Sequence, residues 1–185
     1  MYTDKFRNTV YIYVTKISDR LSYTCGSPSE KGEQLLRRGL RELYSIDLEQ
    51  EERAKTQNGK PYLVNHSEVQ YNISHSGKYV VCAFAQVSVG IDIQEKRIVN
   101  VERIGRKIFP IEEYREFLKS EEKQETFFRQ WVMRESYLKW TGEGLTKDLR
   151  QLQTEGWHRF IHVDREYMCA LWTEHPMEIQ LREVE

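Results

Sequence analysis

Residues 87–94 read VSVGIDIQ and alternate between apolar side chains and small or polar ones. In a β-strand, successive side chains point to opposite faces of the sheet. The apolar set predicts a face buried in a core: Val87, Val89, Ile91 and Ile93. The second set predicts a face that carries a carboxylate next to a glycine: Ser88, Gly90, Asp92 and Gln94. Because a glycine lets another group approach the backbone closely, we expect a close neighbour on this second face.

The segments on either side of this strand predict an α+β fold. Residues 9–14, TVYIYV, are β-branched and aromatic, as is typical of a strand. Ser27, Pro28 and Glu30 spell a capping box with proline at the first helical position, so we expect a helix from there to about Ser45. Further helices are expected at about residues 99–108, 111–118 and 126–140, and further strands at about 71–74, 79–86, 157–163, 167–172 and 179–184. Strands and helices come in blocks rather than in strict alternation, which favours α+β over a parallel α/β sheet.

The composition excludes several classes of protein. There are 28 Lys and Arg against 29 Asp and Glu, for a net charge of −1, which argues against a general nucleic-acid binder. No apolar run approaches the roughly 20 residues needed to cross a bilayer. Three widely spaced cysteines, Cys25, Cys82 and Cys169, suit a reducing cytoplasm better than a disulfide framework. We therefore expect a cytoplasmic protein without nucleic-acid or membrane partners.

Two further stretches carry side chains suited to chemistry. In QWVMRESYLKW, Glu135 and Lys139 lie four residues apart and share one face of a predicted helix. In NISHS, Ser74 and His75 can donate hydrogen bonds to an anion.

Each of these signals has a structural alternative. Asp92 can end a strand on a solvated face, Glu135 and Lys139 can form an exposed ion pair, and His75 can be a structural turn residue. A nucleophile elbow, a glycine-rich phosphate loop and a dinucleotide fingerprint are all absent from the sequence. Taken singly, the signals leave the function open.

The order of the motifs is more specific than any one of them. The chain contains GKP from residue 59, NISHS from 72, VGIDI from 89, an FxxxE element from Phe109 to Glu113, and WxxRESYLK from 131. This series, which runs from about Gly59 to Leu145, resembles the surfactin-type branch of the 4′-phosphopantetheinyl transferase superfamily. The resemblance implies transfer of the 4′-phosphopantetheine group of coenzyme A to a serine of an apo carrier protein (acyl, peptidyl or aryl), with release of adenosine 3′,5′-bisphosphate.

The resemblance also implies a Mg²⁺ site. Asp92 and Glu135 match the carboxylates that hold the metal. Gln94 stands where many relatives carry a third acidic ligand, and its carbonyl oxygen is an uncharged replacement. Arg134 replaces the more usual lysine before the metal-binding glutamate. We therefore expect a metal site that is less acidic than is usual in the family.

Further matching residues are expected to act on coenzyme A and on the attacking serine. Lys60, Ser74 and His75 match residues that bind the coenzyme A phosphates. Lys139 matches a catalytic lysine that also contacts the coenzyme and neutralises its pyrophosphate. Glu113 matches the general base, although a one-residue slip would exchange it with Glu112. Four basic residues are candidates for the adenine end by charge alone, with solvated helix positions as the alternative: Lys31, Arg37, Arg38 and Arg41.

The family architecture implies two similar lobes, residues 1–87 and 88–185, around a central cleft, with the metal and catalytic motifs on the second lobe. Such a chain is expected to work as a monomer. A basic stretch is a candidate surface for an acidic carrier protein, with a plain polar helix face as the alternative: Lys96, Arg97, Arg103, Arg106 and Lys107. Two other functions stay open, a weak or inactive module that binds coenzyme A or a carrier protein, and an unrelated Mg²⁺ phosphohydrolase.

Overall fold

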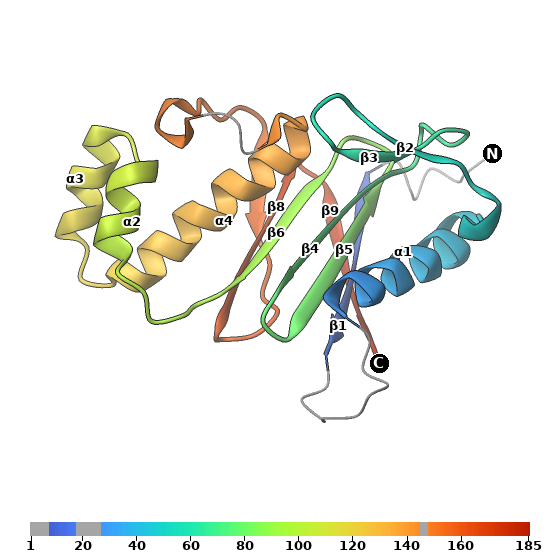
Figure 1. Cartoon of the computed structure of the whole chain (residues 1–185), viewed down its shortest axis with the longest axis horizontal. Helices are drawn as coiled ribbons and strands as arrows, with labels where there is room; N and C mark the ends of the chain where they lie inside the picture. The colour runs from blue at the N-terminus through green and yellow to red at the C-terminus, as the bar shows by residue number, and fades with distance from the viewer. Residues whose placement is uncertain (1–7, 18–26, 145–147) are drawn as a thin grey trace.

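A computed structural model describes residues 8–17, 27–144 and 148–185, and it contains two main sheets and four α-helices (Figure 1). The larger sheet has the strand order β4-β5-β1-β9: β1 Thr9–Lys16, β4 Gln70–Ser76, β5 Tyr79–Ala85 and β9 Glu178–Val184. The smaller sheet has the order β6-β8-β7: β6 Gly90–Glu95, β7 Trp157–Phe160 and β8 Tyr167–Thr173. The helices are α1 Pro28–Tyr44, α2 Val101–Ile108, α3 Ile111–Lys119 and α4 Lys123–Thr141. The predicted α+β class is confirmed.

Short elements complete the chain. β2 (Arg53–Lys55) and β3 (Pro61–Leu63) form a separate antiparallel pair, and single turns of 3₁₀ helix lie at Leu48–Gln50 and Leu149–Gln151. In the described part of the chain, no helix is long and apolar enough to span a membrane.

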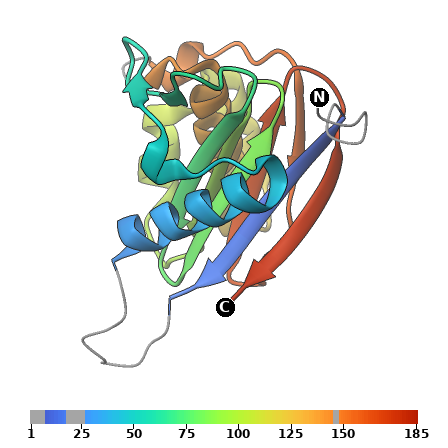
Figure 2. The same ribbon diagram turned by 90° about the vertical axis from the view of Figure 1, so that its right-hand side faces the viewer.

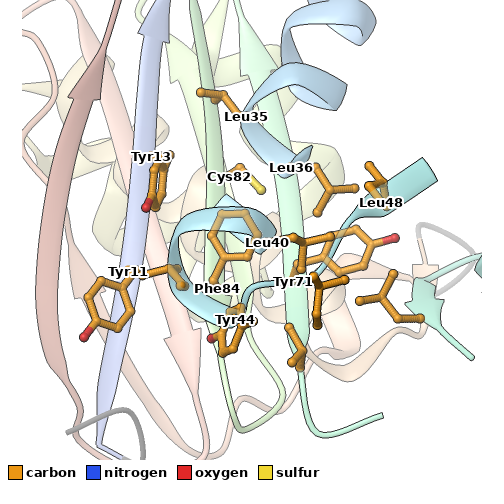
Figure 3. Close-up of a cluster of buried hydrophobic side chains, with 14 of the residues drawn as sticks. Tyr11, Tyr13, Leu35, Leu36, Leu40, Tyr44, Leu48, Tyr71, Cys82 and Phe84 are labelled. Carbon is orange, nitrogen blue, oxygen red and sulfur yellow. The ribbon is translucent and has the colours of Figure 1, made fainter. Parts of the chain in front are cut away.

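Helix α1 covers one face of the larger sheet (Figure 2). It begins with the predicted capping box, in which Ser27 and Glu30 bond each other's backbone N–H groups. It ends at Ser45, which adopts a left-handed conformation with φ of 58°. Its apolar stripe packs with side chains of β1, β4 and β5 into one buried cluster (Figure 3): Leu35, Leu36, Leu40 and Tyr44 from the helix, and Tyr11, Tyr13, Tyr71, Cys82 and Phe84 from the strands.

The two sheets pack face to face and bury a second core. The apolar face predicted for VSVGIDIQ lies in this core, where Val89, Ile91 and Ile93 contact side chains of β1, β5 and β8. Helix α4 covers the face of the smaller sheet that points away from the larger sheet. Helices α2 and α3 pack against α4 near its amino-terminal end (Figure 1). The order of layers is therefore α1, larger sheet, smaller sheet, and the α2–α4 helices.

The chain ends back in the first sheet, since β9 pairs with β1 in parallel. Arg182 of β9 donates to the Tyr13 hydroxyl over 2.7 Å, and that hydroxyl donates to Glu42 of α1 over 2.9 Å. This contact ties the last strand to the first strand and to the first helix. The division into lobes at residues 87 and 88 stays a prediction.

The sheets meet along β4 and β6, which lie side by side (Figure 1) although neither is the other's backbone partner. Side chains of β4 take the place of the missing backbone ladder. They accept hydrogen bonds from β6 N–H groups at three rungs: Asn72 from Ile91 at 3.0 Å, Ser74 from Ile93 at 3.3 Å, and Ser76 from Glu95 at 3.0 Å. The three acceptors are two residues apart and so face the same side of β4.

Helix α4 packs unusually close to β6 at Gly90. A Cβ built on Gly90 would lie 2.1 Å from the Ser136 carbonyl oxygen and 2.3 Å from the Trp140 nitrogen. These atoms belong to the helix backbone and cannot turn aside. The close neighbour expected beside Gly90 is therefore α4, and its approach brings Glu135 and Lys139 towards Asp92.

The Gly90→Ala substitution should strongly destabilise the protein, because its methyl group can be accommodated only if α4 moves off the sheet. We expect a loss of about 3 kcal/mol in the free energy of unfolding, the upper end of the range for overpacking. Urea unfolding measures this change. Gly32→Ala is the matched control, since its methyl group would meet only side chains, Ile73 at 3.1 Å and Val80 at 3.8 Å. Equal losses in the two variants would contradict the packing argument.

Candidate active site

Three secondary-structure elements contribute the central side chains of the candidate site. Asp92 comes from β6, Ser74 from the neighbouring β4, and Glu135 and Lys139 from successive turns of α4. The rung between Ser74 and Ile93 sets β4 against β6, and the contact at Gly90 sets α4 against β6. Residues from three segments that are far apart in the sequence are thus brought together by backbone packing.

Asp92, Ser74 and Lys139 form a closed hydrogen-bonded triangle. Lys139 Nζ donates to Asp92 Oδ1 over 2.7 Å and to Ser74 Oγ over 2.8 Å, and Ser74 donates to Asp92 Oδ1 over 2.8 Å. The Ser74 oxygen also accepts from the Ile93 N–H, so its hydrogen-bonding capacity is filled. The Asp92 side chain is only 9% exposed, which leaves this ion pair largely shielded from solvent. Lys139 therefore bonds across to β6, and the predicted alternative of a solvated face does not apply to Asp92.

Glu135 lies beside this triangle without a partner for one of its oxygens. Its Oε1 is buried and accepts no hydrogen bond within the described residues. Burial, together with the nearby charge of Asp92, raises the pKa of Glu135 to about 7, although Lys139 acts in the opposite direction. An unpartnered carboxylate oxygen close to a second carboxylate is the arrangement that a cation stabilises.

The donor set fits a hard divalent cation that takes only a few protein ligands. Across residues 8–17, 27–144 and 148–185, no cluster of three or more His, Cys, Asp or Glu side chains is suited to hold a metal. A ligand beyond Asp92 and Glu135 would then be an uncharged protein oxygen, water or substrate. Gln94, two residues after Asp92 on β6, donates from its amide nitrogen to Ser76 Oγ over 3.1 Å.

A pocket of about 290 Å³ opens beside these residues. Its lining includes Lys60, Asn72, Glu135 and Lys139, together with glycines of the loops that follow β2 and α4. Lys60 reaches the wall of this pocket, but its ammonium group is already bonded: it donates to Ser88 Oγ over 2.8 Å, to the Val89 carbonyl over 3.3 Å and to the Trp140 carbonyl over 2.8 Å. Burial lowers the pKa of Lys60 to about 8.

His75 does not join the cluster. It follows Ser74 on β4, so its side chain points to the opposite face of the strand, the face on which Ile73 packs towards α1. His75 is exposed there. The structure thus brings Ser74 to Asp92 and turns His75 away from it.

The two candidate bases lie on α3 and differ in their contacts. Glu113 forms an ion pair with Arg134, which is buried on α4 next to Glu135 in the sequence. Glu112 pairs with Arg115 of its own helix at the solvent-exposed surface. Only Glu113 is therefore held against α4.

The roles of Asn72 and Ser76 as hydrogen-bond acceptors for β6 were not predicted from the sequence. Asn72 and Ser76 flank Ser74 at a spacing of two, and this alternation within NISHS was the available signal for a shared face. Of the basic residues proposed for the adenine end, Arg37 pairs with Glu49 and Arg38 pairs with Glu42.

Comparison with known proteins gives two matching family models that adjoin in the chain. The 4′-phosphopantetheinyl transferase superfamily matches residues 88–174, and the family described as 4′-phosphopantetheinyl transferase, N-terminal, matches residues 14–87. A solved structure, the holo-(acyl-carrier-protein) synthase of Thermotoga maritima, is 22% identical with a TM-score of 0.39, over 51% of this chain and 64% of that one.

Among curated proteins, the 4′-phosphopantetheinyl transferase Sfp of Bacillus subtilis (strain 168) is 30% identical over 157 residues, which make up 83% of this chain and 67% of that protein. The 4′-phosphopantetheinyl transferase psf-1 of Bacillus pumilus is 32% identical over 148 residues, which make up 77% of this chain and 63% of that protein. The chain thus spans about two thirds of the length of these curated relatives.

Replacing Glu135 by glutamine should change the pH dependence of stability in protein kept free of metal by a chelator. The folded-state pKa of Glu135 is raised to about 7, so its neutral form is compatible with the folded protein at low pH. As the pH rises through about 7, Glu135 becomes charged in its buried position and the free energy of unfolding falls. Glu135→Gln should therefore melt close to the wild-type temperature at pH 5 and a few degrees higher at pH 8. Thermal unfolding at both pH values measures the difference.

The matched control is Glu116→Gln on α3, where the glutamate side chain is 73% exposed. That substitution should shift the melting temperature little at either pH. A Glu135→Gln variant that is less stable than wild type at pH 8 would contradict the account of Glu135.

Proposed function

The chain belongs to the 4′-phosphopantetheinyl transferase superfamily, and we propose on that premise that it transfers the 4′-phosphopantetheine group of coenzyme A to a serine of an apo carrier protein. Adenosine 3′,5′-bisphosphate is the second product. The observation that carries the proposal is the cluster of Asp92, Ser74 and Lys139 beside the unpartnered Glu135, at the wall of a pocket.

Asp92 and Glu135 are the residues that would hold Mg²⁺, with the Gln94 carbonyl oxygen as an uncharged third donor. The unpartnered Glu135 Oε1 and its neighbouring carboxylate support this assignment. When bound, Mg²⁺ would stabilise the negative charge of the pyrophosphate and of the leaving group.

Lys139 would act on the pyrophosphate. Two of its three ammonium protons are used by Asp92 and Ser74, which orients the group and leaves the third proton for a phosphate oxygen. A cation fixed in this way stabilises developing charge without first having to reorganise. Lys60, Ser74 and His75 stay predicted coenzyme ligands. Contact with phosphate would require Lys60 to exchange bonds that it makes to the α4 carboxyl end, and Ser74 to exchange its bond to Asp92.

In the reaction, the serine oxygen attacks the β-phosphorus of coenzyme A, and the bond from that phosphorus to the oxygen of the leaving nucleotide breaks. The serine proton passes to a base, for which we propose Glu113. Its ion pair with Arg134 holds its carboxylate towards α4, whereas Glu112 is bonded at the surface. One general base contributes about 10²–10⁴-fold, so its loss would slow the transfer without abolishing it.

The carrier protein would bind at α2. Lys96 and Arg97 of the predicted basic stretch are paired with Glu125 and Glu95. Three other members, Arg103, Arg106 and Lys107, line a surface hollow together with Tyr114 and Arg150. Within the described residues these three form no ion pair, so they are available to an acidic partner. Ile98, which precedes α2, is fully exposed and adds an apolar contact beside the basic group.

One alternative function is favoured by a specific residue. The uncharged Gln94 gives the site fewer acidic ligands than the family usually has, which would suit a module that binds coenzyme A or a carrier protein without efficient catalysis. A monomer that works in the cytoplasm stays a prediction for either function.

Mass spectrometry of intact carrier proteins tests the proposal. The protein is incubated with Mg²⁺, coenzyme A and a panel of apo carriers from fatty-acid, polyketide and peptide synthesis. At least one carrier should gain the mass of the phosphopantetheine arm, and omission of Mg²⁺ should prevent the gain. Asp92→Ala and Glu135→Ala are the controls and should be inactive. If no carrier is modified while coenzyme A still binds, the non-catalytic module is the better description.

Reversing the charge of α2 should weaken carrier binding selectively. We expect the double variant Arg103→Glu, Arg106→Glu to raise the KM for the carrier at least about tenfold at low salt, because charges at the rim of an interface mainly affect association. The affinity for coenzyme A should stay unchanged. Steady-state kinetics and calorimetry measure the two quantities. Arg115→Glu on α3, outside this hollow, is the control, and an unchanged KM in the double variant would remove α2 from the docking surface.

A further inference from the structure

The last rung between β4 and β6 also holds the side chain of Gln94, as the middle rung holds that of Asp92. Ser76 Oγ accepts from the Glu95 N–H over 3.0 Å and from the Gln94 amide nitrogen over 3.1 Å. Both lone pairs of the hydroxyl oxygen are thereby used. Ser76 is 9% exposed, so this junction lies inside the seam between the sheets.

The orientation of an amide matters to a cation in a way that the orientation of a carboxylate does not. A carboxylate has two equivalent oxygens and offers one of them after any half-turn. An amide has one oxygen acceptor and one NH₂ donor, so a half-turn replaces a ligand with a group that repels the metal. Gln94 can therefore serve as a ligand only if its amide is held the right way round.

We propose that Ser76 is a positioning residue, which holds the Gln94 amide nitrogen so that the Gln94 carbonyl oxygen is presented to the metal bound by Asp92 and Glu135. This inference rests on the proposed function, since it concerns the same metal site. On this proposal, Ser76 orients the amide of Gln94 so that it can serve as a metal ligand, whereas a glutamate at this position would need no orientation.

The geometry of β6 supports this role. Asp92 and Gln94 are two residues apart on the strand, so their side chains project from the same face of β6. The Ser76 hydroxyl is fixed by the backbone N–H of Glu95, the residue that follows Gln94. The amide is thus held by an atom that is itself anchored to the strand carrying the ligand.

The other two rungs cannot orient the Gln94 amide. Ser74 Oγ is filled by its bonds to Asp92, Lys139 and Ile93. Asn72 accepts from Ile91, at the opposite end of β6 from Gln94. Orientation of Gln94 therefore depends on Ser76 among the three.

A double-mutant cycle tests the proposal, with Mg²⁺ affinity as the readout. Mg²⁺ is titrated by isothermal calorimetry into the protein saturated with coenzyme A, for wild type, Ser76→Ala, Gln94→Glu and the double variant. We expect Ser76→Ala to weaken Mg²⁺ binding about 10-fold or more, the range for loss of a residue that orients a metal ligand. In the Gln94→Glu background the same substitution should have a much smaller effect, because a carboxylate needs no orientation. Gln94→Glu alone should bind Mg²⁺ more tightly than wild type.

Ser76→Thr is the matched control, since it keeps the hydroxyl group, and it should retain nearly the wild-type affinity. Thermal unfolding of each variant separates this effect from a loss of the Glu95 rung, which occurs equally in both backgrounds. Equal weakening of Mg²⁺ binding by Ser76→Ala in the two backgrounds would overturn the proposal, as would an unchanged affinity or a wild type that binds no Mg²⁺. If Mg²⁺ binds as expected but no carrier gains mass, the proposed transfer fails while the role of Ser76 stands.

Discussion

The close contact between the backbones of α4 and β6 at Gly90 is the constraint on which the site depends. A helix normally rests on a sheet through its side chains, which hold its axis well above the strands. Here the Ser136 carbonyl and the Trp140 nitrogen occupy the space that a Cβ would need. The helix therefore lies low enough for Lys139 to reach Asp92 with a direct bond of 2.7 Å. Glu135, one turn earlier, is placed within the electrostatic reach of the same carboxylate.

The seam between β4 and β6 is a second constraint on the same residues. A backbone ladder between these strands would set them about 4.7–4.9 Å apart and merge the sheets into one. Side-chain acceptors on β4 satisfy the β6 N–H groups instead and act as spacers, so the two sheets can fold over each other. Ser74 belongs to this row of spacers and to the triangle with Lys139. The joint between the sheets and the candidate site are therefore partly built from the same atoms.

Local patterns in the sequence predicted what is determined locally. The alternation of residues 87–94 predicted the buried face of β6, and the capping box predicted the start of α1, because strand faces and helix ends depend on nearby residues. Gly90 was correctly expected to mark a close approach, since only glycine leaves that space. The sequence of the strand alone did not predict that the approaching element would be α4.

Pairings across long stretches of sequence were not predictable in this way. Lys139 was open to a local pair with Glu135 four residues away, but it bonds to Asp92, which is 47 residues away. Lys60 bonds to the Trp140 carbonyl 80 residues away. The parallel pairing of β9 with β1 joins the two ends of the chain and leaves no periodic trace. Periodicity shows which face a residue occupies, whereas its partner depends on how the layers stack.

The charges of the site explain why an amide is tolerated at Gln94. Although Lys139 pairs with Asp92, burial and the nearby charge of Asp92 still raise the pKa of Glu135 to about 7. A third carboxylate in this half-buried space would raise it further, because like charges at close range disfavour ionisation. The metal-free protein would then lose stability at neutral pH. In the proposed metal site, an amide would add an oxygen ligand without that repulsion, but it would attract a cation less strongly and in only one orientation. Metal binding at the proposed site would therefore depend less on accumulated negative charge and more on the hydrogen bonds that hold the proposed ligands in place.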